Sequence, residues 1–274
     1  MITAPRQPGD IDDEVVVRAR KGDREALGAV LVSVAPAIHR FGRRMCRNVH
    51  DAEDVLQDTL MNVATHLGDF EGRSSLSSWV FALTRSACAR KRRGLKNRPS
   101  ASNADLEEQA DLAPSPEARA AHQELASALS HALDGLSDDY REAILLRDIE
   151  GLSAPEAASS IGISVDALKS RLHRAREALR AALRPLLEPL APPSTSGCPD
   201  VVALWSKKLD GDLSHADCAR MEKHIAGCPA CGAACDALKQ ALLACQRVRT
   251  DDLPPEIQAR VKAAVRAFVA QSAG

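Results

Sequence analysis

Hydrophobic residues recur at every third or fourth position in several stretches of this chain, which is the spacing of amphipathic helices. Over residues 51–67 the apolar positions of one face are Ala52, Val55, Leu56, Leu60, Val63 and Leu67. Asp51 is the expected N-cap of this helix. A second helix is predicted over residues 76–93, where Trp79 lies on the apolar face and the end is cationic. We therefore expect Trp79 in a hydrophobic core.

Residues 136–182 predict three helices separated by two turns. The first helix spans 138–150, Gly151 forms a turn, the second spans 153–160 behind a Ser153/Glu156 capping box, and a long basic helix follows Gly162. The apolar stripe that must pack inward on this last helix is Leu168, Leu172, Ala175 and Leu179. A short helix, a tight turn and a second helix with a polar face make the helix-turn-helix layout, which inserts a helix into the DNA major groove.

Changes in composition divide the chain. Residues 97–119 are rich in Ser, Asn, Pro and acidic residues, which predicts a linker between folded units at 10–96 and 120–184. Residues 185–197 contain four prolines, and Pro185 is expected to end the preceding helix. A third unit at 198–250 precedes an amphipathic helix at 255–272, with Ile257, Val261, Val265 and Phe268 on its apolar face. We predict an all-α protein.

Composition and charge limit the classes of function that this chain could have. The chain of 274 residues is 45% hydrophobic but only 3% aromatic, which suits compact helices rich in Ala and Leu. The net charge of -1 conceals an uneven distribution of charged residues along the chain. Residues 85–98 carry seven Lys or Arg and no acid, and residues 169–184 carry six Lys or Arg and one Glu. Such cationic segments favour a phosphate backbone. No signal peptide or membrane-length apolar run is present, so a cytoplasmic protein without a membrane partner is expected.

Six of the eight cysteines fall between Cys198 and Cys245. In a reducing compartment, clustered cysteines favour metal binding or reversible redox chemistry over permanent disulfides. The metal-capable residues are spaced as Cys198-x25-His224-x3-Cys228-x2-Cys231. Cys218, Cys235 and Cys245 remain, either as core residues or as additional ligands, and a site rich in thiolates favours zinc, cadmium or copper ions.

The stretches 51–67, 70–93 and 136–180 together resemble regions 2 and 4 of the extracytoplasmic-function sigma factors, and the resemblance covers residues 12–184. It implies that Asp54, Gln57 and Asp58 bind the clamp helices of RNA polymerase. It implies that the melted -10 promoter strand is captured by Gly72, Arg73, Ser74, Ser75, Ser77, Arg85, Arg90, Lys91 and Arg92. It implies that the -35 duplex is read by Ser164, Asp166, Lys169, Ser170, Arg171, His173, Arg174 and Arg176. One departure is residues 154–162, where small side chains replace the family's larger apolar ones.

The cysteine-rich unit resembles the zinc-binding anti-sigma motif, here fused to the sigma factor itself. The resemblance implies that Cys198, His224, Cys228 and Cys231 bind a metal ion, and tetrahedral coordination by three thiolates and one imidazole is chemically sensible. A Cys-rich tail on such a protein is similar to the CorE-like metal-dependent sigma factors. That similarity implies that the tail senses metal and that no separate anti-sigma factor is required.

The sequence therefore predicts a transcription initiation factor that binds core RNA polymerase and promoter DNA and responds to zinc, cadmium or copper. One alternative keeps the sigma activity but makes the tail a redox switch on a structural zinc. Another is a stand-alone helix-turn-helix repressor or activator, which the separate -10-like block argues against. A metal-storage protein would leave both DNA-binding blocks without purpose. No catalytic constellation is found, so we do not expect an enzyme.

Overall fold

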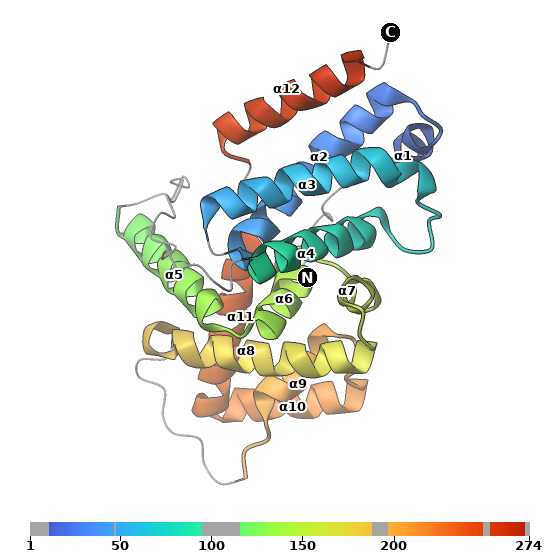
Figure 1. Ribbon diagram of the computed structural model, residues 1–274. Helices are drawn as coiled ribbons and strands as arrows, with labels where there is room; N and C mark the ends of the chain where they lie inside the picture. Colours follow the sequence, from blue (N-terminus) through green and yellow to red (C-terminus); the bar gives the residue numbers. More distant parts are fainter. Residues whose placement is uncertain (1–10, 47, 95–115, 188–196, 249–252, 272–274) are drawn as a thin grey trace. The chain divides into compact units, whose positions relative to one another are not determined.

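The computed structural model describes residues 11–46, 48–94, 116–187, 197–248 and 253–271. All regular structure in these segments is helical, which confirms the predicted all-α fold (Figure 1). The helices are α1 (Asp13–Arg20), α2 (Arg24–Met45), α3 (Val49–His66), η1 (Leu67–Asp69), α4 (Leu76–Gly94), α5 (Pro116–Gly135), α6 (Asp138–Ile144), η2 (Leu145–Ile149), α7 (Ala154–Ile161), α8 (Val165–Leu187), α9 (Val201–Leu209), α10 (His215–Gly227), α11 (Pro229–Val248) and α12 (Pro255–Gln271). None of these helices is long and apolar enough to cross a lipid bilayer.

The chain forms two compact units. The first unit takes residues 1–106, 150–163 and 249–274, and the second takes residues 107–149 and 164–248. The second unit thus joins the long basic helix and the cysteine-rich segment in one compact body. Most of the predicted linker 97–119 and most of the predicted linker 185–197 lie outside the described residues, while residues 116–119 form the start of α5.

The core of the first unit forms around α2. Val30, Ile38 and the α3 residues Val55 and Val63 are completely buried. The start of α3 differs from the prediction, because Asn48 and not Asp51 is its N-cap. The Asn48 side chain accepts a hydrogen bond from the backbone N–H of Asp51 and donates one to its carboxylate, each at 2.8 Å. This reciprocal pair satisfies a backbone N–H group of the first turn, so the helix starts upstream of the predicted position.

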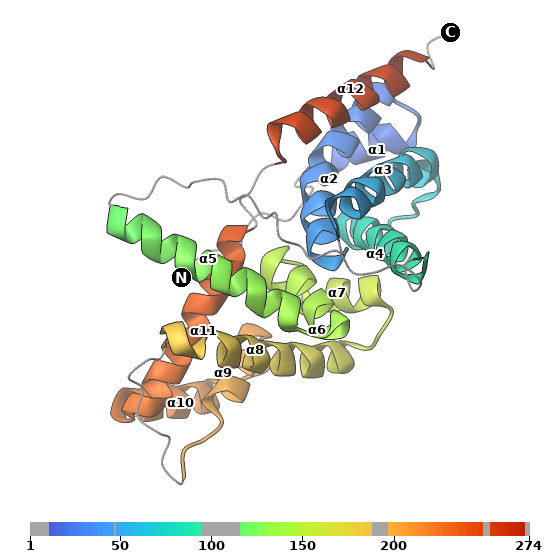
Figure 2. The ribbon, with the colours of Figure 1, turned by 60° about the vertical axis from the view of Figure 1, so that its left-hand side comes forward.

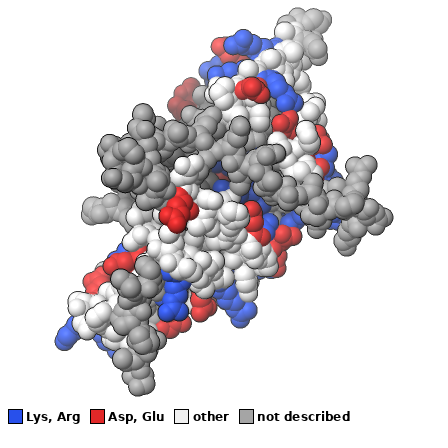
Figure 3. All heavy atoms as spheres, turned by 90° about the vertical axis from the view of Figure 1, so that its left-hand side faces the viewer, with Lys and Arg blue, Asp and Glu red and all other residues white. Residues whose placement is uncertain are grey.

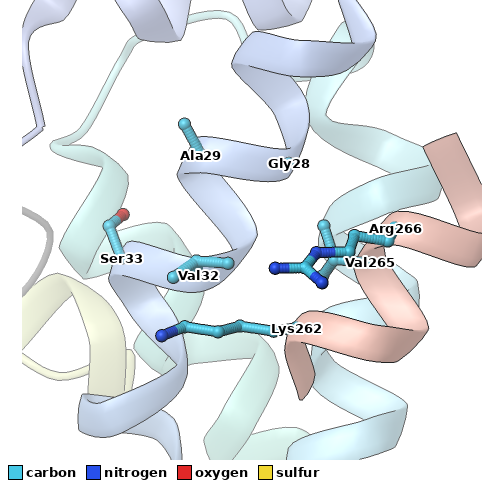
Figure 4. Close-up of a pocket in the computed structure, with 7 residues that line it drawn as sticks. All are labelled: Gly28, Ala29, Val32, Ser33, Lys262, Val265 and Arg266. Atoms are coloured by element: carbon cyan, nitrogen blue, oxygen red, sulfur yellow. The ribbon is translucent and has the colours of Figure 1, made fainter. Parts of the chain in front are cut away.

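Helix α12 lies along α2, as Figures 1 and 2 both show. Of the predicted apolar face, Val261 is buried, and Ile257 and Val265 are partly buried against the same core. Gly28 allows the close approach, because a Cβ atom at this position would lie 3.2 Å from a methyl carbon of Val265. Beside this contact a shallow pocket is lined by Gly28, Ala29, Val32, Ser33, Lys262, Val265 and Arg266 (Figure 4).

Helix α7 packs against α4 through small side chains, which gives a structural reason for the departure at residues 154–162. The Ser160 hydroxyl donates to the carbonyl of Ser78, and the two hydroxyl oxygens lie 3.0 Å apart. Ala157 and Ala158 are buried beside them. Just before α7, Glu150 accepts two hydrogen bonds from Arg40 of α2, at 3.0 and 2.8 Å. Larger apolar side chains on α7 would prevent the serine contacts.

His39 in α2 makes the stability of the first unit depend on pH. Burial lowers its pKa from 6.5 to about 4, with a further contribution from the positive charge of Arg43. The unfolded chain therefore binds a proton between pH 6.5 and about 4 that the folded chain rejects, so stability falls as pH falls through this window. From pH 7 to pH 5 we expect a loss of about 2 kcal/mol from this residue. Urea unfolding of His39→Leu should lack this loss, whereas the exposed-site control His66→Gln should retain it.

The second unit is organised by α8. All four residues of its predicted stripe, Leu168, Leu172, Ala175 and Leu179, are completely buried, which confirms the predicted inward face. Ser164 caps the helix by accepting a hydrogen bond from the N–H of Ala167 at 3.2 Å. The expectation that Pro185 ends the helix is wrong, because α8 continues through it to Leu187, the last described residue of that segment. Pro185 removes one backbone hydrogen bond from α8, and the helix tolerates that loss at this position.

Candidate metal centre and promoter-binding helices

Three chain segments bring four metal-capable side chains together in the second unit. Cys198 precedes α9, His224 lies in the last turn of α10, Cys228 is the residue after α10, and Cys231 lies in the first turn of α11. Their ligand atoms all lie within 4.8 Å of one another. Within the cluster, His224 Nε2 lies 3.3 Å from Cys231 Sγ, and Cys198 Sγ lies 3.8 Å from Cys228 Sγ.

These distances fit a tetrahedral ion. Two sulfurs bound at about 2.3 Å to one zinc ion stand about 3.8 Å apart, and a sulfur and an imidazole nitrogen stand about 3.6 Å apart. Burial and the neighbouring thiols of Cys198 and Cys228 raise the pKa of the Cys231 thiol to about 12. A cation removes this disadvantage of ionising clustered thiols, because it binds the thiolate form. The donor set of three sulfurs and one nitrogen suits zinc and other soft or borderline ions.

Local capping sets the positions of these ligands. Asp200 caps α9, and Ser214 caps α10 by accepting a hydrogen bond from the N–H of Asp217. Pro229 opens α11, where its missing N–H leaves no hydrogen bond unmade. A small core of Val201, Ala234 and Cys235 lies directly beside the ligands. The site is thus held on three helix ends.

The other cysteines are not part of this cluster. The Cys218 sulfur contacts the Glu222 carboxylate at 3.4 Å, while Cys235 and Cys245 are completely buried. Burial raises the pKa of the Cys235 thiol. In the first unit, the sulfurs of Cys46 and Cys88 lie 3.6 Å apart in the core. The structure therefore brings together the four principal predicted ligands without the three additional ones.

Most of the predicted -35 residues line the accessible part of α8. Ser164, Asp166, Ser170 and Arg174 are exposed, and Lys169, Arg171 and His173 are partly exposed. Arg171 lies 3.4 Å from the carboxylate of Asp139 in α6.

The prediction that Arg176 faces solvent or DNA is wrong, because its side chain is completely buried. Its guanidinium donates two hydrogen bonds to Asp148, at 2.7 and 3.0 Å, and one to the Ser206 hydroxyl at 2.6 Å. It also lies 3.3 Å from Asp210. Arg176 adjoins the apolar stripe, and α9 covers that flank of α8. Its role in this structure is to join helices.

Sequence reasoning missed the partners that α9 and its following turn supply to α8 and η2. Asp212 lies 2.6 Å from the ammonium group of Lys169. Arg147 of η2 lies 3.8 Å from Asp210 and donates a hydrogen bond to the Leu209 carbonyl at 3.2 Å. The only signal in the sequence was an Asp-Gly-Asp turn after a short helix, which is common at helix ends and does not identify a partner.

The predicted -10 residues are spread over the loop before α4 and over α4 itself. Gly72, Arg73 and Arg90 are exposed, and Ser74, Ser75, Arg85, Lys91 and Arg92 are partly exposed. Ser77 is only 6% exposed, so its side chain is not presented on the surface of this unit. Ser75 accepts a hydrogen bond from the N–H of Ser78 and so serves the start of α4.

The predicted polymerase-binding residues Asp54, Gln57 and Asp58 are all exposed on α3. Asp54 also pairs with Lys91 at 2.6 Å, so one predicted polymerase contact and one predicted DNA contact neutralise each other. The hydrogen bond from Lys91 to Asp54 raises the pKa of the lysine. On the face drawn in Figure 3, acidic and basic side chains among the coloured residues likewise lie next to each other.

Comparison with known proteins gives three family matches. Residues 31–98 match Sigma-70 region 2, residues 126–179 match Sigma-70 region 4, and residues 198–232 match a zinc-finger family. The chain is 31% identical over 168 residues to the ECF RNA polymerase sigma factor SigM of Mycobacterium tuberculosis H37Rv, a match that covers 61% of this chain and 82% of that protein.

Two solved structures are also similar. CnrH in complex with the cytosolic domain of CnrY has 28% identity and a TM-score of 0.49, and the match covers 64% of this chain and 98% of that one. The sigma factor RpoE of Bartonella quintana, in complex with the anti-sigma factor NepR, has 27% identity and a TM-score of 0.46, covering 61% of this chain and 98% of that one.

Proposed function

This chain belongs to the ECF family of RNA polymerase sigma factors, and we propose that a metal ion held by Cys198, His224, Cys228 and Cys231 controls its activity. As a sigma factor it binds core RNA polymerase and promoter DNA. The observation that carries the proposed control is the position of the four-ligand cluster, which lies in one compact unit with the helix α8.

The proposed division of labour assigns one step to each helix. The exposed polar face of α3 binds the polymerase clamp, and the loop before α4 with the cationic end of α4 binds the melted -10 strand. An unstacked strand needs a cationic groove. The exposed face of α8 reads the -35 duplex, because duplex readout needs a helix in the major groove. Ser77 and Arg176 are left out of these surfaces because both are buried.

The metal would act by fixing the helices that contact α8. A bound cation supplies cross-links between the segment before α9, the end of α10 and the start of α11. Helices α9 and α11 pack against α8, as Figure 1 shows for α9. A change in their arrangement therefore changes the surroundings of the promoter-binding helix. A ligand shifts such an equilibrium only by its difference in affinity for the two states.

The redox alternative uses the same residues. Oxidation of two metal-bound thiolates, Cys198 and Cys228, to a disulfide would pass two electrons to an added oxidant and remove two metal ligands, with no proton released because both groups are already ionised. An anti-sigma factor is a second candidate partner, because RpoE of Bartonella quintana was solved in complex with the anti-sigma factor NepR. Our prediction that this chain needs no such protein stays a prediction.

Reconstituted transcription tests the proposed function. Purified full-length protein and core polymerase are assayed anaerobically under reductant while Zn(II), Cd(II) or Cu(I) is titrated. We expect the output of the wild type to change with at least one metal and that of Cys228→Ser/Cys231→Ser to stay constant. Cys218→Ser is the matched control, because its sulfur lies outside the cluster, and it should follow the wild type.

The outcomes separate the alternatives. Equal output from wild type and double variant under all metals would remove the metal control while leaving the sigma assignment in place. A response only to oxidant, with none to metal under reduction, would favour the redox switch. A requirement for an added protein before any metal response would contradict self-contained control.

A further inference from the structure

We propose that the turn after α9, residues 210–212, is an intramolecular competitor of promoter DNA for α8. This acidic turn would hold Lys169 of the -35 surface through Asp212, so that DNA binds only after the ion pair is broken. The inference rests on the proposed role of α8 in binding DNA, and it names what regulates that surface.

Asp210 anchors the acidic turn. Its carboxylate is 3% exposed and lies 3.3 Å from Arg176 and 3.8 Å from Arg147. Burial raises its pKa while the charge of Arg176 opposes that rise, so the anchor depends on its cationic partners. Ser206 adds a hydrogen bond from Arg176 one turn earlier in α9. These buried contacts hold the end of α9 on the flank of α8.

Gly211 gives the turn its shape. Its φ angle of 77° lies in the left-handed region that favours glycine, while a Cβ atom there would meet nothing within 4 Å. Glycine is therefore favoured at position 211 by the backbone conformation and not by a lack of space for a side chain. The N–H of Asp212 donates to the Lys207 carbonyl at 2.8 Å, which closes the turn. The turn thereby brings the Asp212 side chain to Lys169.

The Lys169–Asp212 ion pair, at the tip of the acidic turn, is exposed to water, unlike the buried contacts of Asp210. The side chains of Lys169 and Asp212 are 26% and 41% exposed, so solvent screens their attraction. Hydrogen bonding to Asp212 raises the pKa of Lys169. A screened ion pair is readily exchanged, and a DNA phosphate offers the same ammonium group another anionic oxygen. The anchor positions the competitor, and the tip is the part that DNA displaces.

A competitor inside the chain lowers the apparent affinity for DNA. Binding is reduced by the fraction of molecules in which Lys169 is released. Arg171, the other paired cation of this surface, faces Asp139 of α6 and not the cysteine-rich segment. The effect of the acidic turn should therefore depend on Lys169 specifically.

The test measures DNA binding by the full-length protein carrying Asp212→Asn. Fluorescence anisotropy with a short mixed-sequence DNA duplex is recorded over a range of salt concentrations. We expect several-fold tighter binding and a salt dependence of log K against log salt that is steeper by about 0.9, the value for one additional phosphate contact. The control Asp236→Asn makes the same charge change at an exposed residue paired with Lys239 of its own helix.

Two results would overturn the proposal. Asp212→Asn could bind no more tightly than Asp236→Asn, which would reduce the effect to net charge. Alternatively, the gain could persist in a Lys169→Ala background, where the proposal requires it to vanish. Failure of metal control in the transcription assay leaves this binding difference unaffected, so the two proposals fail separately. Circular dichroism of each variant checks that the fold is retained.

Discussion

Replacing Arg176 with methionine is expected to lower the free energy of unfolding of the second unit by about 3–5 kcal/mol. The guanidinium is completely buried between Asp148 and Asp210, whose side chains are 9% and 3% exposed. Its removal leaves two carboxylates buried without their main cationic partner. The Asp148 and Asp210 charges hold the pKa of Arg176 above its ordinary value although burial opposes it, so the arginine stays charged in the fold.

The measurement can be confined to one unit. The chain has two tryptophans, Trp79 in the first unit and Trp205 in α9 of the second. In a Trp79→Phe background, urea unfolding followed by fluorescence reports the second unit alone. Arg174→Met is the matched control, because this arginine is exposed on the same helix, and its effect should stay within about 0.5 kcal/mol. Equal stabilities of the Arg174 and Arg176 variants would contradict the structural role of Arg176.

Removing the metal should destabilise the cysteine-rich segment more than any single substitution outside it. Structural zinc contributes about 10–16 kcal/mol of apparent binding free energy in small zinc domains. The apolar core beside these ligands is small, consisting of Val201, Ala234 and Cys235. We expect chelation of purified protein, or His224→Ala, to shift the Trp205 unfolding transition to much lower urea and to remove the bound ion.

Two internal controls accompany the metal experiment. The Trp79 transition of the first unit should not move, since none of the four ligands belongs to that unit. Cys218→Ser should retain the ion, because its sulfur lies outside the cluster. Stoichiometric metal in His224→Ala, together with an unchanged Trp205 transition after chelation, would disprove the proposed ligand set.

Some helices of this protein are evident in the sequence and others are not. The stripe of α8 was predictable because its four apolar positions follow the helical period without interruption. Helices α1 and α2 were not predicted. In α2 apolar residues occur almost continuously and Pro36 interrupts the pattern, so the sequence shows no single apolar face. Several helices surround α2, so it needs no such single face.

The sequence by itself determined the local features, which depend only on residues close together along the chain. Helical period and the Ser153 capping box depend on separations of three or four residues, over which helix geometry is nearly fixed. The spacing of His224, Cys228 and Cys231 identified candidate ligands, but Cys228 lies in extended backbone between α10 and α11, so helix geometry alone does not place them.

Only the tertiary structure decided what covers each helix. Position 176 lies at the edge of the apolar stripe, and either solvent or another helix could adjoin it. Asp148 and Asp210, each about thirty residues away along the chain, hold Arg176 in a buried ion-pair cluster. Asp212 pairs with Lys169 at a position that water reaches. Such pairings depend on how distant segments pack, and local periodicity carries no information about them.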